Sequence, residues 1–593
     1  MSRYHIKSKI ALACTSNHFK LLAITASMLG TIAPATYAEE VAIEEVVVVG
    51  IRASLTRAMD VKRNESGVVD AISAEDIGKF ADANLAESLQ RVTGVSIDRV
   101  SGEGSQITVR GLGPNFNLVT LNGRQLPTAN SPEQESIASA TQSRAFNFNQ
   151  IASEGVSGVS VYKTSRANLP SGGLGATVDI KTARPFDFDG TKFVASISGI
   201  NDTSVEEGSN LTPEIGGLFS TQLLDGRLGL LANFSVSERD YSESSAHTDG
   251  WLRDNIGGAE YAEYCANRDC TGIPYIYRPV SNIGEIQHNE RERTNAGFVA
   301  QFAPTDNLEF TLDYVLSRFE NRQERFQVGL FGVVGANTTS NVELSENNSL
   351  LRVTRRDSAA DAIFYKNKLN IENDSIGLNV KWDVNDMLRV TLDTHSSTAE
   401  SQPGKELADV TQIAQGPLGN IFDINYRSGG VDIAIDDSGA FRGDQQFGGG
   451  APVPGVTGFQ SPAGFSPLGT VLRNIAIDNT VDQIQLEAEF DFDTIQVSAG
   501  ISQIDYEVET NALLVGFQFQ GLIPCPTCPD FIDNPSSSGA PSSFQTINQI
   551  DIDGFVTGAF PTQNQAFLDN TPPTFFGASE ESLALYVNVD GEF

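Results

Sequence analysis

The sequence predicts an antiparallel β-barrel that spans a membrane, preceded by a small α+β domain. Three observations carry this prediction. The N-terminus has the form of a secretory signal peptide, the segments beyond residue 185 alternate apolar and polar residues, and the connections between those segments alternate between short and long. No later window approaches the roughly 18 apolar residues of a transmembrane helix, so strands would have to cross the membrane.

The first 38 residues predict export. Arg3, Lys7 and Lys9 form a positively charged region ahead of an apolar segment at 21–33, and small residues lie at the cleavage positions near Ala38. A membrane anchor is the alternative, but this apolar segment is too short to span a bilayer comfortably. Cleavage after Ala38 would leave a mature protein that begins at Glu39.

The chain is strongly acidic. Its 75 Asp and Glu residues outnumber 40 Lys and Arg residues, for a formal charge of −35, and loss of the four basic residues of the signal peptide takes this to −39. Binding to a phosphate backbone needs clustered Lys and Arg, so nucleic acid is not an expected partner. The acidity fits loops that face water, small solutes or divalent ions.

The cysteines fit an oxidising compartment. Cys14 leaves with the signal peptide, and the other four form two close pairs, Cys265 with Cys270 and Cys525 with Cys528. Such pairs predict small-loop disulfides in an exported protein. A zinc site would need four ligands brought together, and the histidines show no ligand spacing around either pair. Neither a metal nor a cofactor is expected.

The segment from about residue 68 to 182 has the mixed pattern of a compact α+β domain. Asp82 can cap a helix that ends near Gly94. The run Asn122-Gly123 predicts a tight turn, and the glycines at 172–175 predict a turn rather than a phosphate-binding loop, because no helix with Lys-Ser or Lys-Thr follows them. Strands are predicted at 107–110, 119–121, 156–162 and 176–180.

Ten alternating strands are predicted beyond this domain. Residues 308–317, for example, place Leu, Phe and Tyr on one face and mostly polar residues on the other. A soluble, half-buried sheet would show the same alternation, so alternation alone does not choose between the two. The strands are expected at 191–201, 213–222, 228–240, 294–303, 308–320, 375–384, 387–400, 481–491, 494–507 and 581–590.

The connections between these strands favour the membrane. Short turns are predicted at 225–226, 304–307, 385–386 and 492–493, and they alternate with a modest connection at 202–212 and long loops near 241–293, 321–374, 401–480 and 508–580. Outer-membrane barrels have short turns at the periplasmic end and long loops outside. A soluble sandwich would scatter its long loops over both ends.

A valine run lies just behind the signal peptide. It consists of Glu44, Glu45, Val46, Val47, Val48, Val49 and Gly50. Consecutive valines favour an extended strand, and a strand near a free N-terminus can add itself to the open edge of another protein's sheet. The alternative is an ordinary first strand of the next domain.

Several short motifs follow the valine run in order. They are Asn84-Leu85-Ala86-Glu87-Ser88-Leu89, Thr93-Gly94-Val95, Ile107-Thr108-Val109-Arg110-Gly111, Val119-Thr120-Leu121-Asn122-Gly123 and Val159-Ser160-Val161-Tyr162-Lys163. No one of them is specific, but their order and spacing together resemble the plug domain of the TonB-dependent outer-membrane receptors. The second motif departs from that family, where Pro-Gly-Val is more usual.

The resemblance implies an energised transporter rather than an enzyme. A plug domain at 61–185 would sit inside the lumen of a barrel that begins at 186, and the segment 39–60 would lie on the periplasmic side. The valine run would then be the box that binds the TonB complex of the inner membrane. The protein would contact lipid in the outer membrane of a Gram-negative bacterium. A passive porin would not explain the plug, and a secreted enzyme or adhesin would need a catalytic constellation or repeated unit that the sequence does not show.

The resemblance also bears on the ligand. Residues 51–55 and 165–170 are similar to a subgroup often associated with carbohydrate uptake, so an oligosaccharide is the expected ligand and a ferric siderophore the alternative. Aromatic rings would stack on sugars and amides would bind hydroxyls. These side chains can equally pack the plug against the barrel wall, and Arg110 can be a buried ion-pair partner of a barrel carboxylate. The candidate ligand contacts are Arg110, Asn115, Phe116, Asn117, Phe146 and Phe148.

The strand count differs from that of the family. Its barrels have about 22 strands, whereas this sequence predicts roughly the first ten, and a ten-stranded lumen is too narrow for a folded domain of this size. Asp590-Gly591 also resembles another short turn. We therefore expect a C-terminally truncated receptor with a partial barrel at 186–593, the alternative being that Phe593 is a true barrel end.

Overall fold

The structure is a computed structural model of the chain. All residues described belong to one compact unit, Ala53–Phe593. The valine run, the signal peptide, Asp82, Cys525 and Cys528 lie outside the described residues. The structure describes residues 59, 61–63, 65, 67–73, 84–100, 102–129, 144–151, 155–205, 208–248, 250–255, 259–266, 270–331, 339–358, 361–401, 409–415, 420–427, 432–436, 466–492, 494–515, 532–533, 549–550 and 574–591.

The N-terminal domain is built on a five-stranded sheet with the strand order β1-β6-β7-β4-β5. Strands β4 and β7 are parallel, and the other pairs are antiparallel. The four predicted strands are confirmed, whereas the short strands β1, β2 and β5 were not predicted. The elements are β1 (Val69–Ser73), α3 (Leu85–Leu89), β2 (Val95–Val100), β3 (Glu103–Val109), η2 (Pro114–Phe116), β4 (Asn117–Leu121), β5 (Arg124–Gln125), η3 (Phe148–Gln150), β6 (Val156–Tyr162), β7 (Ala176–Thr182) and η4 (Pro185–Asp187).

Two local signals explain how this domain begins and turns. Asn84 caps helix α3, because its side chain accepts a hydrogen bond from the Glu87 backbone N–H at 3.2 Å. The helix ends at Leu89 rather than near Gly94, so it is shorter than predicted. The predicted turn at Asn122-Gly123 is confirmed, with φ of 55° and 85°, and it pairs Leu121 with Arg124 as two-residue hairpins do.

The core of this domain lies between the helix and the sheet. Leu85 and Leu89 are fully buried, as are Val109, Val161 and Ile180. Phe146 and Phe148 belong to the same core and meet edge to face, with ring centroids 5.2 Å apart. The apolar side chains of this domain pack against one another in this core, so the surface of the domain can be polar.

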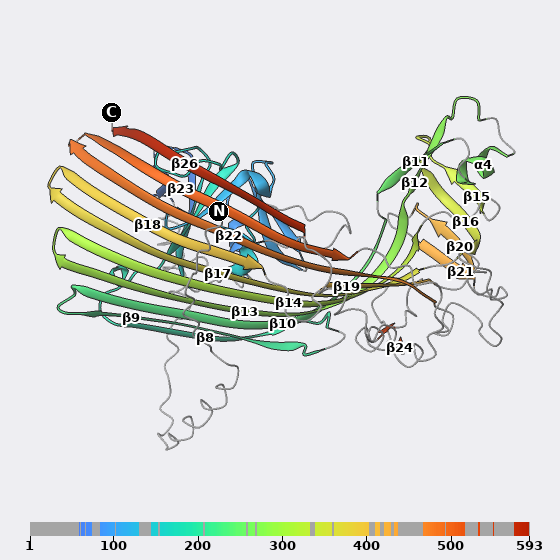
Figure 1. The fold of residues 1–593 in the computed structure, drawn as a ribbon, viewed down its shortest axis with the longest axis horizontal. Helices are drawn as coiled ribbons and strands as arrows, with labels where there is room; N and C mark the ends of the chain where they lie inside the picture. The colour runs from blue at the N-terminus through green and yellow to red at the C-terminus, as the bar shows by residue number, and fades with distance from the viewer. Residues whose placement is uncertain are drawn as a thin grey trace, which may run out of the picture. The chain divides into compact units, whose positions relative to one another are not determined.

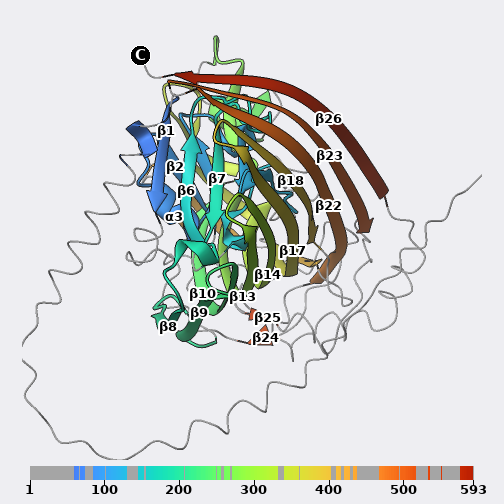
Figure 2. The ribbon, with the colours of Figure 1, turned by 90° about the vertical axis from the view of Figure 1, so that its left-hand side faces the viewer.

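All ten strands predicted beyond residue 185 are present and form one antiparallel sheet (Figure 1). The order is β26-β23-β22-β18-β17-β14-β13-β10-β9-β8, and the described parts of β8 and β26 each pair on one side only. The sheet curves, and the strands of the N-terminal domain lie on its concave side (Figure 2). From the resemblance noted above we call this domain the plug and the large sheet the wall. The strands are β8 (Lys192–Asn201), β9 (Leu211–Leu223), β10 (Leu228–His247), β13 (Ser281–Thr305), β14 (Leu308–Phe331), β17 (Asp361–Asn385), β18 (Leu388–Ser401), β22 (Ser466–Phe492), β23 (Ile495–Val515) and β26 (Thr574–Gly591).

Several strands are longer than predicted at the end that carries the long loops. Strand β13 begins at Ser281 rather than near residue 294, and β14 continues to Phe331 rather than ending near 320. The predicted loops near 241–293, 321–374, 401–480 and 508–580 are correspondingly shorter. The apolar alternation stops before the strands do, because a strand that leaves the bilayer has no lipid to face. Sequence alternation therefore marks the membrane crossing and not the whole strand.

The long connections contain structure of their own. Strand β11 (Trp251–Asn255) pairs with β12 (Tyr275–Pro279), and helix α4 (Ala259–Cys265) lies between them in sequence. Cys265 and Cys270 form a disulfide with their Cα atoms 5.7 Å apart. The other elements are β15 (Thr339–Leu344), β16 (Leu350–Ser358), β20 (Asn420–Asn425) and β21 (Asp432–Asp436) in one sheet, β19 (Asp409–Gln415) beside β17 and β22, and the short pair β24 (Ile532–Asp533) and β25 (Gln549–Ile550).

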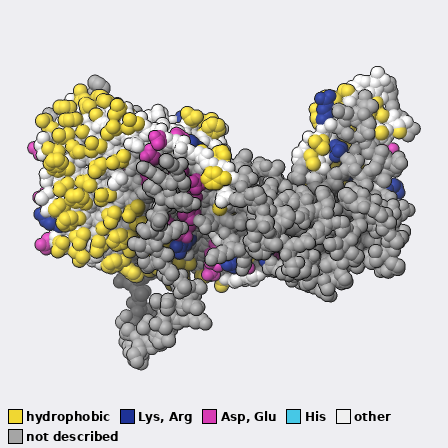
Figure 3. Space-filling view, viewed as in Figure 1, with side chains coloured by type: hydrophobic (Ala, Val, Ile, Leu, Met, Phe, Trp, Pro, Cys, Tyr) yellow, Lys and Arg dark blue, Asp and Glu magenta, His cyan; other side chains and the backbone are white. Residues whose placement is uncertain are grey.

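An apolar belt covers the convex face of the large sheet, at the end that carries the short turns (Figure 3). Beyond it the same face becomes charged: Arg318 on β14 pairs with Glu372 on β17 at 3.0 Å. In the described part of the chain, no helix is long and apolar enough to cross a membrane. The belt has the character of a lipid-facing surface. Its exposed side chains include Phe298, Leu312, Ile376, Leu378, Trp382, Leu486 and Leu585.

The belt predicts a position-dependent response to charge. Leu486→Arg places a cation in the middle of the apolar belt and should cost about 2–4 kcal/mol of folding free energy in a bilayer. Asp482→Arg lies on the same strand and face but beyond the belt, opposite Asp505, and should be tolerated. Urea unfolding in lipid vesicles measures both variants. Equal loss in the two would show that the belt does not face lipid.

Candidate functional site

The plug is joined to the large sheet by a buried arginine. Arg124 is only 2% exposed and lies on β5, directly after the Asn122-Gly123 turn. Its Nη1 donates to both carboxylate oxygens of Asp313 on β14, at 2.7 and 2.8 Å, and its Nε and Nη2 donate to Asp393 on β18, at 2.7 and 2.9 Å. We call these three residues the Arg124 cluster.

Gly377 makes room for this cluster. It lies on β17, between the two aspartate strands, and pairs with Asp313 in the sheet register. A Cβ atom at this position would lie 1.7 Å from Nη1 of Arg124, which no side chain can relieve without displacing the guanidinium. The glycine thus lets the arginine rest against the backbone of the wall. Burying the charge costs several kcal/mol, and the two carboxylates offset that cost.

A second cluster has the opposite polarity. Glu103 on β3 of the plug is 4% exposed and receives three arginines of the wall. Arg239 on β10 lies 2.5 Å from it, and on β13 Arg291 and Arg293 lie 2.7 and 3.2 Å from it. We call these four residues the Glu103 cluster. The plug thus offers a cation at one place and an anion at another, which fixes its orientation as well as its position.

The arginines also set the ionisation of the plug carboxyl. Burial raises the pKa of Glu103, but the charges of Arg291, Arg293 and Arg239 outweigh it, so the pKa lies below its ordinary value of 4.5. Glu103 is therefore charged at neutral pH, and its attraction to the wall is intact there.

Several other contacts between the plug and the wall are polar, beside small apolar ones such as the cluster that holds Ala129 of the plug with Phe319 of the wall. The Gln125 backbone N–H donates to Oε1 of Gln483 at 3.1 Å, and the Phe186 N–H donates to Oε1 of Gln301 at 2.9 Å. Nδ2 of Asn373 donates to Oε1 of Gln150 at 2.8 Å. Such bonds exchange with water at small net cost, unlike a close-packed apolar interface. The two ion clusters are consequently the strongest specific ties described.

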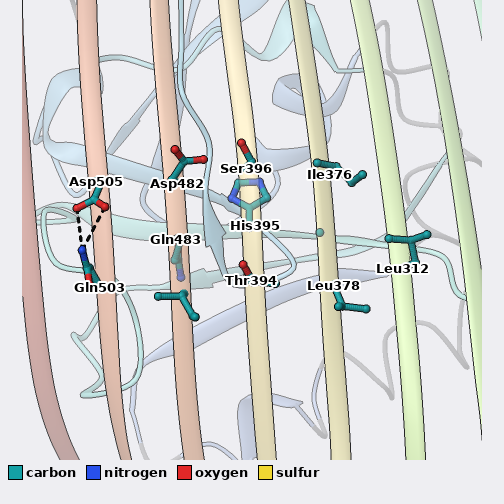
Figure 4. A pocket seen from close by; sticks show the side chains of 12 residues that line it. Leu312, Ile376, Leu378, Thr394, His395, Ser396, Asp482, Gln483, Gln503 and Asp505 are labelled. Atoms are coloured by element: carbon teal, nitrogen blue, oxygen red, sulfur yellow. Dashed lines mark hydrogen bonds between the residues drawn. The ribbon is translucent and has the colours of Figure 1, made fainter. Parts of the chain in front are cut away.

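The wall beside the Arg124 cluster contains a pocket (Figure 4). His395 and Gln483 lie there on neighbouring strands, with Leu312, Ile376 and Leu378 on the apolar side. His395 shares a hydrogen bond of 2.9 Å with Ser375, and Gln483 accepts the plug bond described above. Within the described ranges no group of His, Cys, Asp or Glu side chains is placed to hold a metal ion. Leu312, Ile376 and Leu378 are also exposed members of the apolar belt, so the pocket is a hollow of the convex face and not part of the seat of the plug.

Arg110, for which a buried ion pair with a wall carboxylate was the alternative to ligand contact, forms no such pair among the described residues. Arg110 is exposed and donates from Nη2 to the Gly175 carbonyl at 2.7 Å, in a turn where its own φ is 53°. Arg124 makes the buried pairs instead. Its partners are 189 and 269 residues away in sequence, but one signal was available: Asp313 lies on the face of its strand opposite the apolar residues.

The predicted ligand contacts divide into two groups. Phe146 and Phe148 are 6% and 1% exposed within the plug core, and Asn117 is 6% exposed and donates to the Ile107 carbonyl at 2.9 Å. Burial of these three residues supports the packing alternative and contradicts ligand contact. Arg110, Asn115 and Phe116 are exposed, and Asn115 accepts a hydrogen bond from the Ala145 N–H at 3.1 Å. These three can still reach a solute.

A family model decides what this domain is. Residues 61–177 match the TonB-dependent Receptor Plug Domain. These residues are the plug domain of a TonB-dependent receptor. The match ends within β7, so it covers the N-terminal domain and none of the large sheet.

Solved structures of such receptors resemble the chain only distantly. The ferric enterobactin receptor of Pseudomonas aeruginosa, as a mutant in complex with enterobactin, matches at 11% identity over 76% of this chain and 78% of that one, with a TM-score of 0.31. An unliganded ferric citrate transporter matches at 11% over 77% and 75%, with a TM-score of 0.26. The siderophore receptor of Acinetobacter baumannii matches at 12% over 88% and 92%, with a TM-score of 0.24. No curated protein matches the sequence.

The Arg124 cluster predicts a non-additive pattern. Arg124→Met leaves two buried carboxylates without their cation and should cost about 3–5 kcal/mol of plug binding to the wall. The triple variant Arg124→Met, Asp313→Asn, Asp393→Asn removes the unpaired charges and should regain much of that loss. Limited proteolysis of the plug in urea measures both. A single variant as protected as the unaltered protein would contradict the cluster's role.

The Glu103 cluster predicts acid sensitivity. Because the pKa of Glu103 is lowered in the folded state, its stabilisation is present above the ordinary pKa of 4.5 and is lost as the pH falls through the lower folded value. Protease protection of the plug should therefore fall in that acid range. Glu103→Gln should be less protected at neutral pH and should lose this part of the acid dependence. An unchanged acid profile in the variant would contradict the assignment.

Proposed function

We propose that the protein actively imports a scarce oligosaccharide across the outer membrane of a Gram-negative bacterium, driven by the TonB complex. The observation that carries the transport part is the seating of the plug. Two buried ion clusters of opposite polarity fix it against the wall, and several of the other described contacts are polar and exchangeable. Such a plug seals at rest and yields to a directed pull.

The strand order of the plug supports a pull from the N-terminus. The valine run precedes β1, and β1 is an edge strand whose described residues pair only with β6, through five residue pairs. Strand addition by TonB to Val46–Val49 would apply force at this edge. Arg124 lies on β5, the opposite edge of the same sheet. The sheet would therefore be peeled from one side while the other side stays anchored.

The ligand assignment is supported by chemistry and by resemblance. Arg110, Asn115 and Phe116 offer a guanidinium, an amide and a ring on the exposed plug surface, groups suited to hydroxyls and sugar faces. The amino-acid sequence at 51–55 and 165–170 resembles that of the carbohydrate-uptake subgroup. A ferric siderophore remains the competing ligand, and uptake assays separate the two.

Uptake should depend on the backbone of the valine run. Val47→Pro removes an N–H donor and disrupts an added strand, so transport should fall to background while ligand binding is retained. Val47→Thr keeps the donor and the strand propensity and is the matched control. Uptake by whole cells of labelled oligosaccharides and of ferric siderophores measures both variants. Transport that survives Val47→Pro would exclude TonB coupling through this run, and loss confined to iron uptake would replace the sugar by a siderophore.

A further inference from the structure

A small aromatic face lies outside the membrane-spanning part of the chain. The hairpin of β11 and β12 is inserted between β10, which ends at His247, and β13, which begins at Ser281. This connection is at the end of the sheet opposite the short turns (Figure 1), and the apolar belt lies at the other end (Figure 3). In a transporter oriented with its short turns in the periplasm, the hairpin faces the outside of the cell.

One face of this hairpin carries four side chains that we call the aromatic platform: Trp251, Arg253, Tyr275 and Tyr277. They share a face because alternate residues of a strand do, and Arg253 pairs with Tyr277 in the register. Trp251 is 48% exposed and Tyr277 is 36% exposed. Hydrophobic and basic side chains lie together over this hairpin in Figure 3. Three aromatic rings on one exposed surface favour a binding role.

Among the described residues, the cation of the platform has no acidic partner. Arg253 is exposed, its guanidinium carbon lies 4.0 Å from the ring centroid of Tyr275, and within the described residues it forms no ion pair. Two neighbouring arginines behave differently, since Arg352 pairs with Asp423, and Arg427 pairs with Glu343. In a chain with 75 acidic residues, an arginine that lies over a tyrosine ring and pairs with no described carboxylate has donors available for an anion.

The platform is also held in place. Ile276, between the two tyrosines, points to the other face and is fully buried. The Tyr277 N–H donates to the Asn348 carbonyl at 2.8 Å, which ties the hairpin to the turn between β15 and β16. The rings of Tyr275 and Tyr277 meet edge to face, with their centroids 5.3 Å apart. The ring centroids of Trp251 and Tyr426 lie 6.2 Å apart. Side chains fixed in this way lose little freedom when a ligand binds.

We propose that the aromatic platform binds the acidic sugar units of an oligosaccharide, with a uronate carboxylate on Arg253 and sugar rings on Trp251 and Tyr277. This inference rests on the proposed uptake of an oligosaccharide and narrows it to a carboxylated one. A neutral sugar would need the rings but not a stacked, unpaired cation. A bidentate guanidinium–carboxylate contact supplies the selectivity.

The two tryptophans of the chain allow a direct test. Trp251 is on the platform, and Trp382 is on the apolar belt with a similar exposure of 47%. In the Trp382→Phe variant of the full chain, Trp251 is the sole tryptophan reporter. A galacturonic acid hexamer should change its emission saturably, and a galactose oligomer of equal length should bind at least about tenfold more weakly, a difference of about 1.4 kcal/mol. In the Trp251→Phe variant neither sugar should change the emission of Trp382.

Arginine variants in the same background test the anion contact. Arg253→Gln should weaken binding of the uronate oligomer at least about tenfold and abolish the preference over the neutral oligomer. Arg427→Gln, in the same region but paired with Glu343, should leave both unchanged. No response of Trp251 to the uronate oligomer, or equal affinity for the two oligomers, would overturn the proposal.

This test is separable from that of the proposed function. If the uronate oligomer does not change the emission of Trp251 while sugar uptake still requires Val47, the platform proposal falls and TonB-driven uptake stands. If Trp251 binds the uronate oligomer while uptake is indifferent to Val47→Pro, the transport proposal falls and the platform stands.

Discussion

The structure depends on the burial of one guanidinium between two strands of the wall. Arg124 carries its charge into a protein-filled interior, where it is tolerated only because Asp313 and Asp393 together accept four of its hydrogen bonds. This requirement explains the glycine at 377 and the tight turn at Asn122-Gly123, which brings the arginine to the sheet edge. The plug is thus held by directional charge pairs, together with other polar contacts and small apolar clusters.

The Glu103 cluster fixes the orientation of the plug against the wall. Glu103 offers the wall a negative charge where Arg124 offers a positive one, so a rotated plug would bring like charges together. The sheet order then separates two tasks, because β1 follows the valine run in sequence and β5 carries the anchor at the far edge. An edge strand can be removed one residue pair at a time, whereas the buried pairs must break together. This separation underlies the proposed mechanism of partial release.

The sequence predicted the features that depend on the surrounding lipid or water. It missed the features that depend on contacts between residues far apart in the chain. All ten wall strands were predictable because lipid requires an apolar outward face, as in Leu312 and Leu378. The full length of β13 was not, because beyond the belt both of its faces are polar. Physical reasoning anticipated a buried arginine paired with a wall carboxylate but assigned it to Arg110, since partners 189 and 269 residues away leave no local pattern. For Phe146 the sequence allowed either ligand contact or packing, and the structure places its ring in the core of the plug.

The central claim is that the Arg124 cluster keeps the far edge of the plug seated while the near edge is pulled. Single-molecule extension of the full chain in a bilayer, pulled through the valine run, tests this directly. The account predicts a first extension that stops before residue 124, at no more than about 3.6 Å per residue released, and a longer one in Arg124→Met. Equal extensions in the two proteins, or release of the entire plug in one step, would contradict it.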